Sequence, residues 1–184
     1  MTRPFIAALA FALACATSAC SSDTIDAAPA TNNAALHDPG YSLIDAEITE
    51  TGELGQPRYT VNAAQAQQNP ATGQIALEGI RMRLQDQRGN DWRLRANSGK
   101  MTEGASMVAL RGAVTVDGSP GGGTEPVQLR TEELDVDTET QRASTRAIVT
   151  ITMSGRLLTA QGMHADLKTR QLRLESNVHG RFTP

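Results

Sequence analysis

The sequence predicts an all-β protein, an antiparallel sheet rolled onto itself and built from repeated strand-turn-strand units. Two observations lead to this prediction. From Tyr41 onward, apolar and polar residues alternate at period two in almost every segment, which is typical of strands with one buried and one solvated face. The same kind of segment also recurs along the chain. Helical spacing of apolar residues is nearly absent, so helices are not expected to contribute to the fold.

Each recurring unit begins with an apolar strand followed by a small residue. The small residues are Ala63, Ala96, Thr131 and Ala160. A second apolar strand follows about 18 residues later in each unit, at Ile80, Val114, Val149 and Val178. Turn-forming residues separate the strands, as at 69–73 and 137–141. One unit cannot bury its apolar face alone, so four units are expected to stack into a sandwich, a jelly roll or an open trough.

Residues 1–19 are expected to be an export signal or a membrane anchor. The apolar run Phe5 to Ala16 follows a single arginine and ends in small residues, and it is shorter than the roughly 20 apolar residues of a spanning helix. Ala19 is the small residue that lipoprotein processing requires, so Cys20 is a candidate for lipid attachment, with plain cleavage as the alternative. Residues 20–40 are expected to be a flexible tether, and 41–184 the folded β-domain, for which the family resemblance described below implies a periplasmic β-jellyroll.

The charge balance argues against a nucleic-acid partner. The 17 Lys and Arg residues and 20 Asp and Glu residues give a net charge of -3, unlike the basic surface that releases counterions from phosphates. Cys15 and Cys20 are the two cysteines of the chain, so the folded part is expected to have no disulfide framework.

No set of residues suggests catalysis. His37 falls in the expected tether, and His164 and His179 alternate with apolar residues as surface side chains do. None has a second imidazole at ligand spacing, and no nucleophile, base and orienting group are placed together. We therefore expect neither an enzyme nor a metal or cofactor site.

The expected interior is aliphatic, because only 3% of the residues are aromatic. Such an interior could be a dry core, filled to normal packing density, or a groove that admits alkyl chains. The residues expected to line it are Val61, Trp92, Leu94, Val108, Leu110, Val114, Val116, Leu129, Leu134, Val136, Val149, Ile151, Met163, Leu172 and Leu174.

Five segments, in order, resemble the LptC family of lipopolysaccharide export proteins within the OstA-like β-jellyrolls. They are YSLIDAEITETGELGQPRYTVNA, DWRLRANSGKM, MVALRGAVTV, VQLRTEELDVDTETQRASTRAIVTI and LTAQGMHADLKTRQLRLESNVHGRF. Together they cover Tyr41 to Phe182, essentially all of the expected domain. The N-terminal segment differs from the family pattern, since members of the family typically keep a transmembrane helix where this chain has the short apolar run Phe5 to Ala16.

The resemblance implies a role in lipopolysaccharide transport. Acyl chains of lipid A would lie in the aliphatic groove and pass from the inner-membrane proteins LptF and LptG, driven by the ATPase LptB, to the periplasmic bridge LptA. It also implies that the C-terminal edge pairs with LptA, and that the edge near 41–63 meets the membrane transporter. The candidate interface residues are Arg173, Glu175, Val178, Arg181 and Phe182.

The expected location is the periplasm, with attachment to the inner membrane through the N-terminal anchor or a lipid. Two alternatives remain open at this point. One is a cleaved, soluble bridge protein similar to LptA, and the other is a structural β-sandwich with a solid core.

Overall fold

The computed structural model of the protein describes residues 40–52, 55–86, 89–102, 104, 106–119 and 126–182. The expected export segment, Cys20 and the tether up to residue 39 lie outside the described residues. The nine strands are β1 (Ser42–Thr51), β2 (Pro57–Asn69), β3 (Gln74–Gln85), β4 (Asp91–Thr102), β5 (Met107–Gly118), β6 (Val127–Asp137), β7 (Arg142–Met153), β8 (Arg156–Asp166) and β9 (Gln171–Phe182). Within these residues, no helix is long and apolar enough to cross a bilayer.

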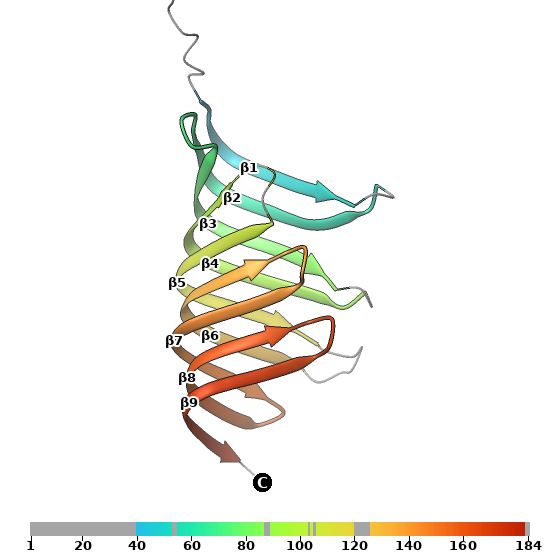
Figure 1. Cartoon of the computed structure of the whole chain (residues 1–184), viewed down its shortest axis with the longest axis vertical. Coiled ribbons are helices and arrows are strands. Elements are labelled where there is room, and N and C mark those ends of the chain that lie inside the picture. The colour runs from blue at the N-terminus through green and yellow to red at the C-terminus, as the bar shows by residue number, and fades with distance from the viewer. Residues whose placement is uncertain are drawn as a thin grey trace, which may run out of the picture. The chain divides into compact units, whose positions relative to one another are not determined.

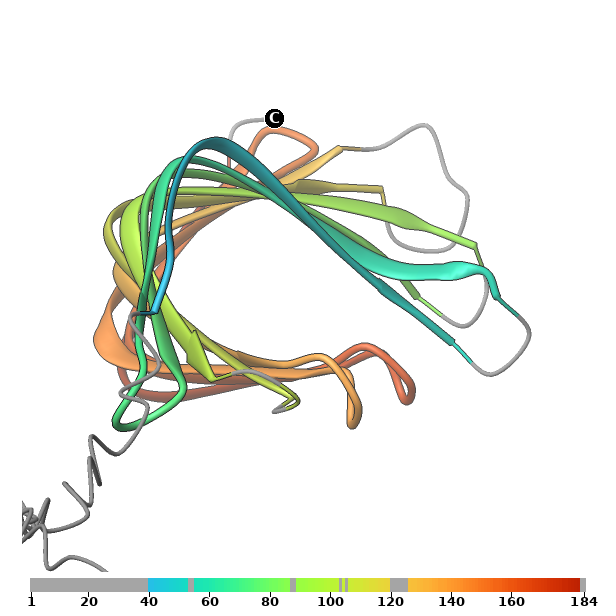
Figure 2. The ribbon, with the colours of Figure 1, turned by 90° about the horizontal axis from the view of Figure 1, so that it is seen from above.

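All nine strands form one antiparallel sheet in which each strand pairs with the next along the chain (Figure 1). The predicted all-β rolled sheet is therefore confirmed. The sheet folds over so that its two halves face each other, and one side stays open (Figure 2). It does not close into a barrel, because β1 and β9 each pair with only one neighbour. The sheet thus has two free edges.

The fold-over arises because strands bend near their middle. The pairing register shifts between Arg95 and Ser98 of β4 and between Thr131 and Asp135 of β6, and such irregularities bend a strand. In β3, Gly79 has a φ of 62°, which side chains rarely adopt. A Cβ at Gly79 would also lie 3.0 Å from the Cβ of Ala64.

The recurring small residues lie at these bends, in the middle of long strands, whereas the sequence analysis placed them after short ones. Two of them face larger residues across the sheet, with Ala96 opposite Ile80 and Ala160 opposite Val149. All four of these side chains are buried. The reason is steric, because the two halves approach most closely at the bend and leave little volume there. The repeated unit is therefore a hairpin of two long, bent strands.

The hairpin connections alternate between the two rims of the open side. The ends of β1, β3, β5 and β7 lie along the first rim, and the ends of β2, β4, β6 and β8 lie along the second (Figure 2). The arrangement forms a trough with apolar side chains inside.

Candidate functional site

Much of the trough interior is a tightly packed core. Val61, Val108, Leu110, Val114 and Val149 are completely buried, at 0% exposure. Leu94, Leu134 and Val136 are buried with them. These eight belong to the fifteen residues that the sequence analysis assigned to the interior. In this section the aliphatic side chains pack against one another.

Beyond this section the interior continues as an apolar pocket of about 310 Å³. Six of the other predicted residues line it, namely Trp92, Val116, Leu129, Ile151, Met163 and Leu172. The last of the fifteen, Leu174, is half-buried against the core. Val127, Met153, Leu158, Ala165 and Leu167 also line the pocket, although they are not among the fifteen residues predicted to line the interior. The signal that could have found them is the same alternation, followed to the strand ends.

The two rims of the trough face each other with an offset along the chain. Arg58, at the start of β2, reaches the turn between β6 and β7, and Asp86, after β3, borders the pocket together with Leu167 and Arg170 of the β8–β9 turn. The start of β2 therefore contacts the β6–β7 turn, and the end of β3 lies beside the β8–β9 turn.

The last strand leaves apolar groups uncovered. Every β9 side chain is exposed except the half-buried Leu174, and Leu172, Val178 and Phe182 are 49%, 50% and 66% exposed. Leu172 and Leu174 face Ala165 and Met163 of β8, so β9 extends the apolar wall of the pocket to the free edge.

The five predicted interface residues all lie on β9, which has one unpaired edge. One of them already has a partner on β8, since Oε1 of Glu175 lies 2.7 Å from Nε2 of His164. The other terminal strand, β1, carries Leu43 and Ile44 at 44% and 78% exposure. Both free edges are therefore flanked by exposed apolar side chains.

One polar group in the pocket wall has no partner. The indole Nε1 of Trp92 is buried and, among the described residues, makes no hydrogen bond. The ring lies flat on Gly118 of β5, where a Cβ would come within 2.5 Å of it. A buried donor without an acceptor costs about 1–3 kcal/mol, so this group lowers the stability of the pocket wall.

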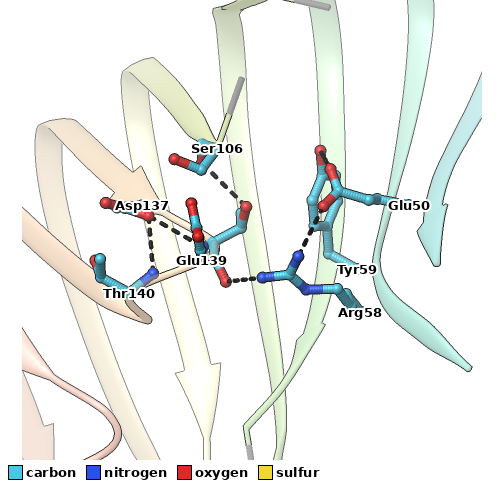
Figure 3. Close-up of polar contacts among 8 residues, drawn as sticks. Glu50, Arg58, Tyr59, Ser106, Asp137, Glu139 and Thr140 are labelled. Carbon is cyan, nitrogen blue, oxygen red and sulfur yellow. Dashed lines mark hydrogen bonds and ion pairs between the residues drawn. The ribbon is translucent and has the colours of Figure 1, made fainter. Parts of the chain in front are cut away.

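The opposite end of the trough is held shut by a polar clasp, defined as Glu50, Arg58, Tyr59, Ser106 and Thr138 (Figure 3). Nη2 of Arg58 donates to the main-chain oxygen of Thr138 at 3.4 Å, and Nη1 donates to Oε1 of Glu50 at 3.2 Å. Tyr59 donates to Oε2 of Glu50 at 2.8 Å. Burial, followed by the bond to Glu50, raises the pKa of Tyr59 well above its usual range. Tyr59 is therefore a neutral donor.

The turn that receives Arg58 is itself well ordered by hydrogen bonds. The hydroxyl of the buried Thr138 donates to the main-chain oxygen of Ser106 at 3.0 Å, and the amide of Thr140 donates to Oδ1 of Asp137 at 2.9 Å. The bond from Thr140 lowers the pKa of Asp137 below its ordinary value of 3.8. A second cross-rim bond joins Nε2 of Gln141 to the main-chain oxygen of Gln85 at 3.4 Å.

These features define the class of protein: a β-jellyroll module with an apolar interior, clasped at one end and open at the other. In the part of the chain that the structure describes, no three His, Cys, Asp or Glu side chains are grouped as metal ligands.

A family model described as lipopolysaccharide-assembly, LptC-related, matches residues 7–183. The chain belongs to the LptC family. Among solved structures it is similar to LptH from Pseudomonas aeruginosa, described as the LptA homologous periplasmic component of the conserved lipopolysaccharide transport device. The TM-score is 0.57 at 10% identity, over 68% of this chain and 95% of that one, which shows a shared fold. No curated protein sequence matches the chain.

Proposed function

We propose that this protein is a non-enzymatic carrier of lipopolysaccharide that binds acyl chains of lipid A in the pocket at its C-terminal end. The observation that supports this proposal is the pocket itself, whose exposed surface is mostly apolar and continues along β9 to a free edge. The choice of lipopolysaccharide as the lipid rests on family membership, because the matching family model is described as lipopolysaccharide-assembly, LptC-related.

The energetic reason for such a pocket is the cost of acyl chains in water. Exposure costs about 0.8 kcal/mol per methylene, so a chain of about twelve carbons carries a penalty of about 10 kcal/mol. Hydrophobic contact has no preferred direction, so a chain can slide out of one apolar slot into the next.

The size of the pocket limits what it holds. A volume of about 310 Å³ is at the small end of ligand sites, which span about 300–1,000 Å³. It suits one acyl chain, with the rest of lipid A outside. To admit more chains, the packed section would have to separate.

The free edges suggest how the lipid moves between proteins. An unpaired strand can hydrogen-bond to the edge of a neighbouring sheet. In this proposal β9 pairs with LptA, and Arg173, Glu175, Val178, Arg181 and Phe182 form the contact. β1 pairs with LptF or LptG, which act with the ATPase LptB. The N-terminal segment, or a lipid on Cys20, holds the domain at the periplasmic side of the inner membrane.

A soluble bridge role is the second candidate, and the similarity to LptH favours it. Mass spectrometry of the mature N-terminus separates the two roles. A retained apolar segment or a lipidated Cys20 supports the anchored carrier, and an unmodified cleaved terminus supports the soluble bridge.

Photo-cross-linking in cells tests the proposal. A photoreactive residue at Leu129 or Leu158 in the pocket should label lipopolysaccharide, because both side chains line the space. The matched position Leu110, which is completely buried, should label it much less. Absence of lipopolysaccharide from every pocket position would contradict the proposal and favour a structural sandwich.

A further inference from the structure

The outer face of the sheet carries a concentrated positive charge on one half of the trough. Arg81 and Arg83 of β3 lie directly opposite Arg95 and Arg93 of β4, and Arg130 of β6 extends one of these rows through Thr115. All five arginines are exposed. We name them the arginine face. Like charges placed directly opposite each other destabilise a sheet, so this arrangement is not explained by folding.

Few negative charges lie near the arginine face. In the two rows that these arginines occupy on β2 to β7, Asp117 is the one acidic residue, and it faces Arg93 while accepting a bond from Gln128 at 2.8 Å. Glu47 follows on β1, where Asn62 donates to it, and Asp91 lies two residues before Arg93. Among the described residues, none of the five guanidinium groups forms an ion pair.

On the outer face of the other half, basic residues lie opposite acidic residues of the neighbouring strand. Arg111 faces Glu133 in register and contacts Asp135 at 2.8 Å, and Arg142 faces Asp166 and contacts it at 3.0 Å. There the sequence places opposite charges across from each other, which stabilises a sheet. Among the described strand pairs, arginines lie directly opposite each other on the arginine face alone, although the whole chain is negatively charged.

The remaining side chains of the two rows identify the kind of partner. On β2 to β7 they are Thr60, Asn62, Thr115, Asp117, Gln128, Thr150 and Thr152. None of the exposed large apolar side chains of the described residues lies in these rows on β2 to β7. Protein interfaces are usually centred on aromatic or aliphatic anchors, whereas a membrane surface attracts basic residues by charge alone, at about 1 kcal/mol each.

We propose that the arginine face binds the surface of a bilayer that contains anionic phospholipids. This contact is separate from the proposed lipopolysaccharide pocket, since the arginines point away from the trough interior. It would orient the domain on the membrane whether or not the pocket is occupied.

The test is co-sedimentation of the mature chain, purified from expressing cells, with phosphatidylcholine vesicles with and without phosphatidylglycerol. Wild type should bind the anionic vesicles more strongly, and salt should weaken this binding. The variant R81Q/R83Q/R93Q/R95Q should lose at least about tenfold in affinity. The matched control is K100Q/R146Q/R156Q/K168Q, which removes four exposed charges outside the arginine face and should bind within about twofold of wild type.

The N-terminal segment is identical in all three proteins, so it does not affect the comparison. The arginine variant should also unfold at the same or a higher temperature, because two like-charged pairs are removed. Equal losses in both variants would overturn the proposal, as would equal binding to neutral and anionic vesicles. Displacement by an acidic protein or by millimolar inorganic phosphate would also overturn it, assigning the face to another anion.

Discussion

Leu110 and Leu129 show that the interior of the trough consists of a tightly packed section and a pocket. Both are inward-facing leucines on neighbouring strands, β5 and β6. Leu110 is completely buried in the packed section, whereas Leu129 is 9% exposed and borders the pocket. The chemistry of the side chain is the same in both places. The difference comes from what lies across the trough, which is packed aliphatic side chains for Leu110 and partly open space for Leu129.

The largest expected effect is on stability. Leu110→Ala removes methyl groups that are packed on all sides and should lower the free energy of unfolding by about 3 kcal/mol or more. Leu129→Ala should cost about half as much, because its cavity merges with an existing space. Chemical denaturation of the two variants measures this difference. Equal losses would show that the pocket is as tightly packed as the rest of the interior.

A smaller effect is expected at the clasp. Arg58→Ala removes the bond to the main-chain oxygen of Thr138 and the ion pair with Glu50. The side chains of Arg58 and Glu50 are about one-third exposed, so the loss of unfolding free energy should stay below about 1 kcal/mol. Amide hydrogen exchange should nevertheless speed up at Thr138, whose N–H donates to Ser106 across 2.9 Å, because the rims can separate more often.

Arg142→Ala is the control for the clasp variant, because it removes an ion pair with Asp166 that joins neighbouring strands and does not cross the open side. If this control raised the exchange rate at Thr138 as much as Arg58→Ala, the clasp would have no specific role in holding the rims together.

The alternating pattern was sufficient to predict the fold class. Residues such as Val61, Leu94 and Val136 were assigned to the interior because their neighbours in sequence are polar, and they are buried. The four recurring small residues also revealed the repeat. Their position in the middle of strands was not predictable from spacing, because a bulge and a turn both interrupt alternation in the same way.

The alternation of apolar and polar residues could not predict which part of the interior is tightly packed and which part forms the pocket. Alternation reports which face of a strand is apolar, and it is the same for Val108 and Val116 of β5, although the first is completely buried and the second lines the pocket. The outcome depends on the offset between the rims, which brings residues such as Arg58 and Thr138 together across 80 positions of sequence. Contacts of this range leave no local signal.

The most direct test of the account is a lipid titration followed by methyl NMR of the labelled Ile, Leu and Val side chains. A soluble lipid A analogue should shift the signals of Leu129, Ile151 and Leu158 in the pocket. The signals of Val108, Leu110 and Val149 in the packed section should stay in place. Shifts spread evenly over both groups, or confined to the packed section, would contradict a carrier that is open at its C-terminal end and clasped at the other.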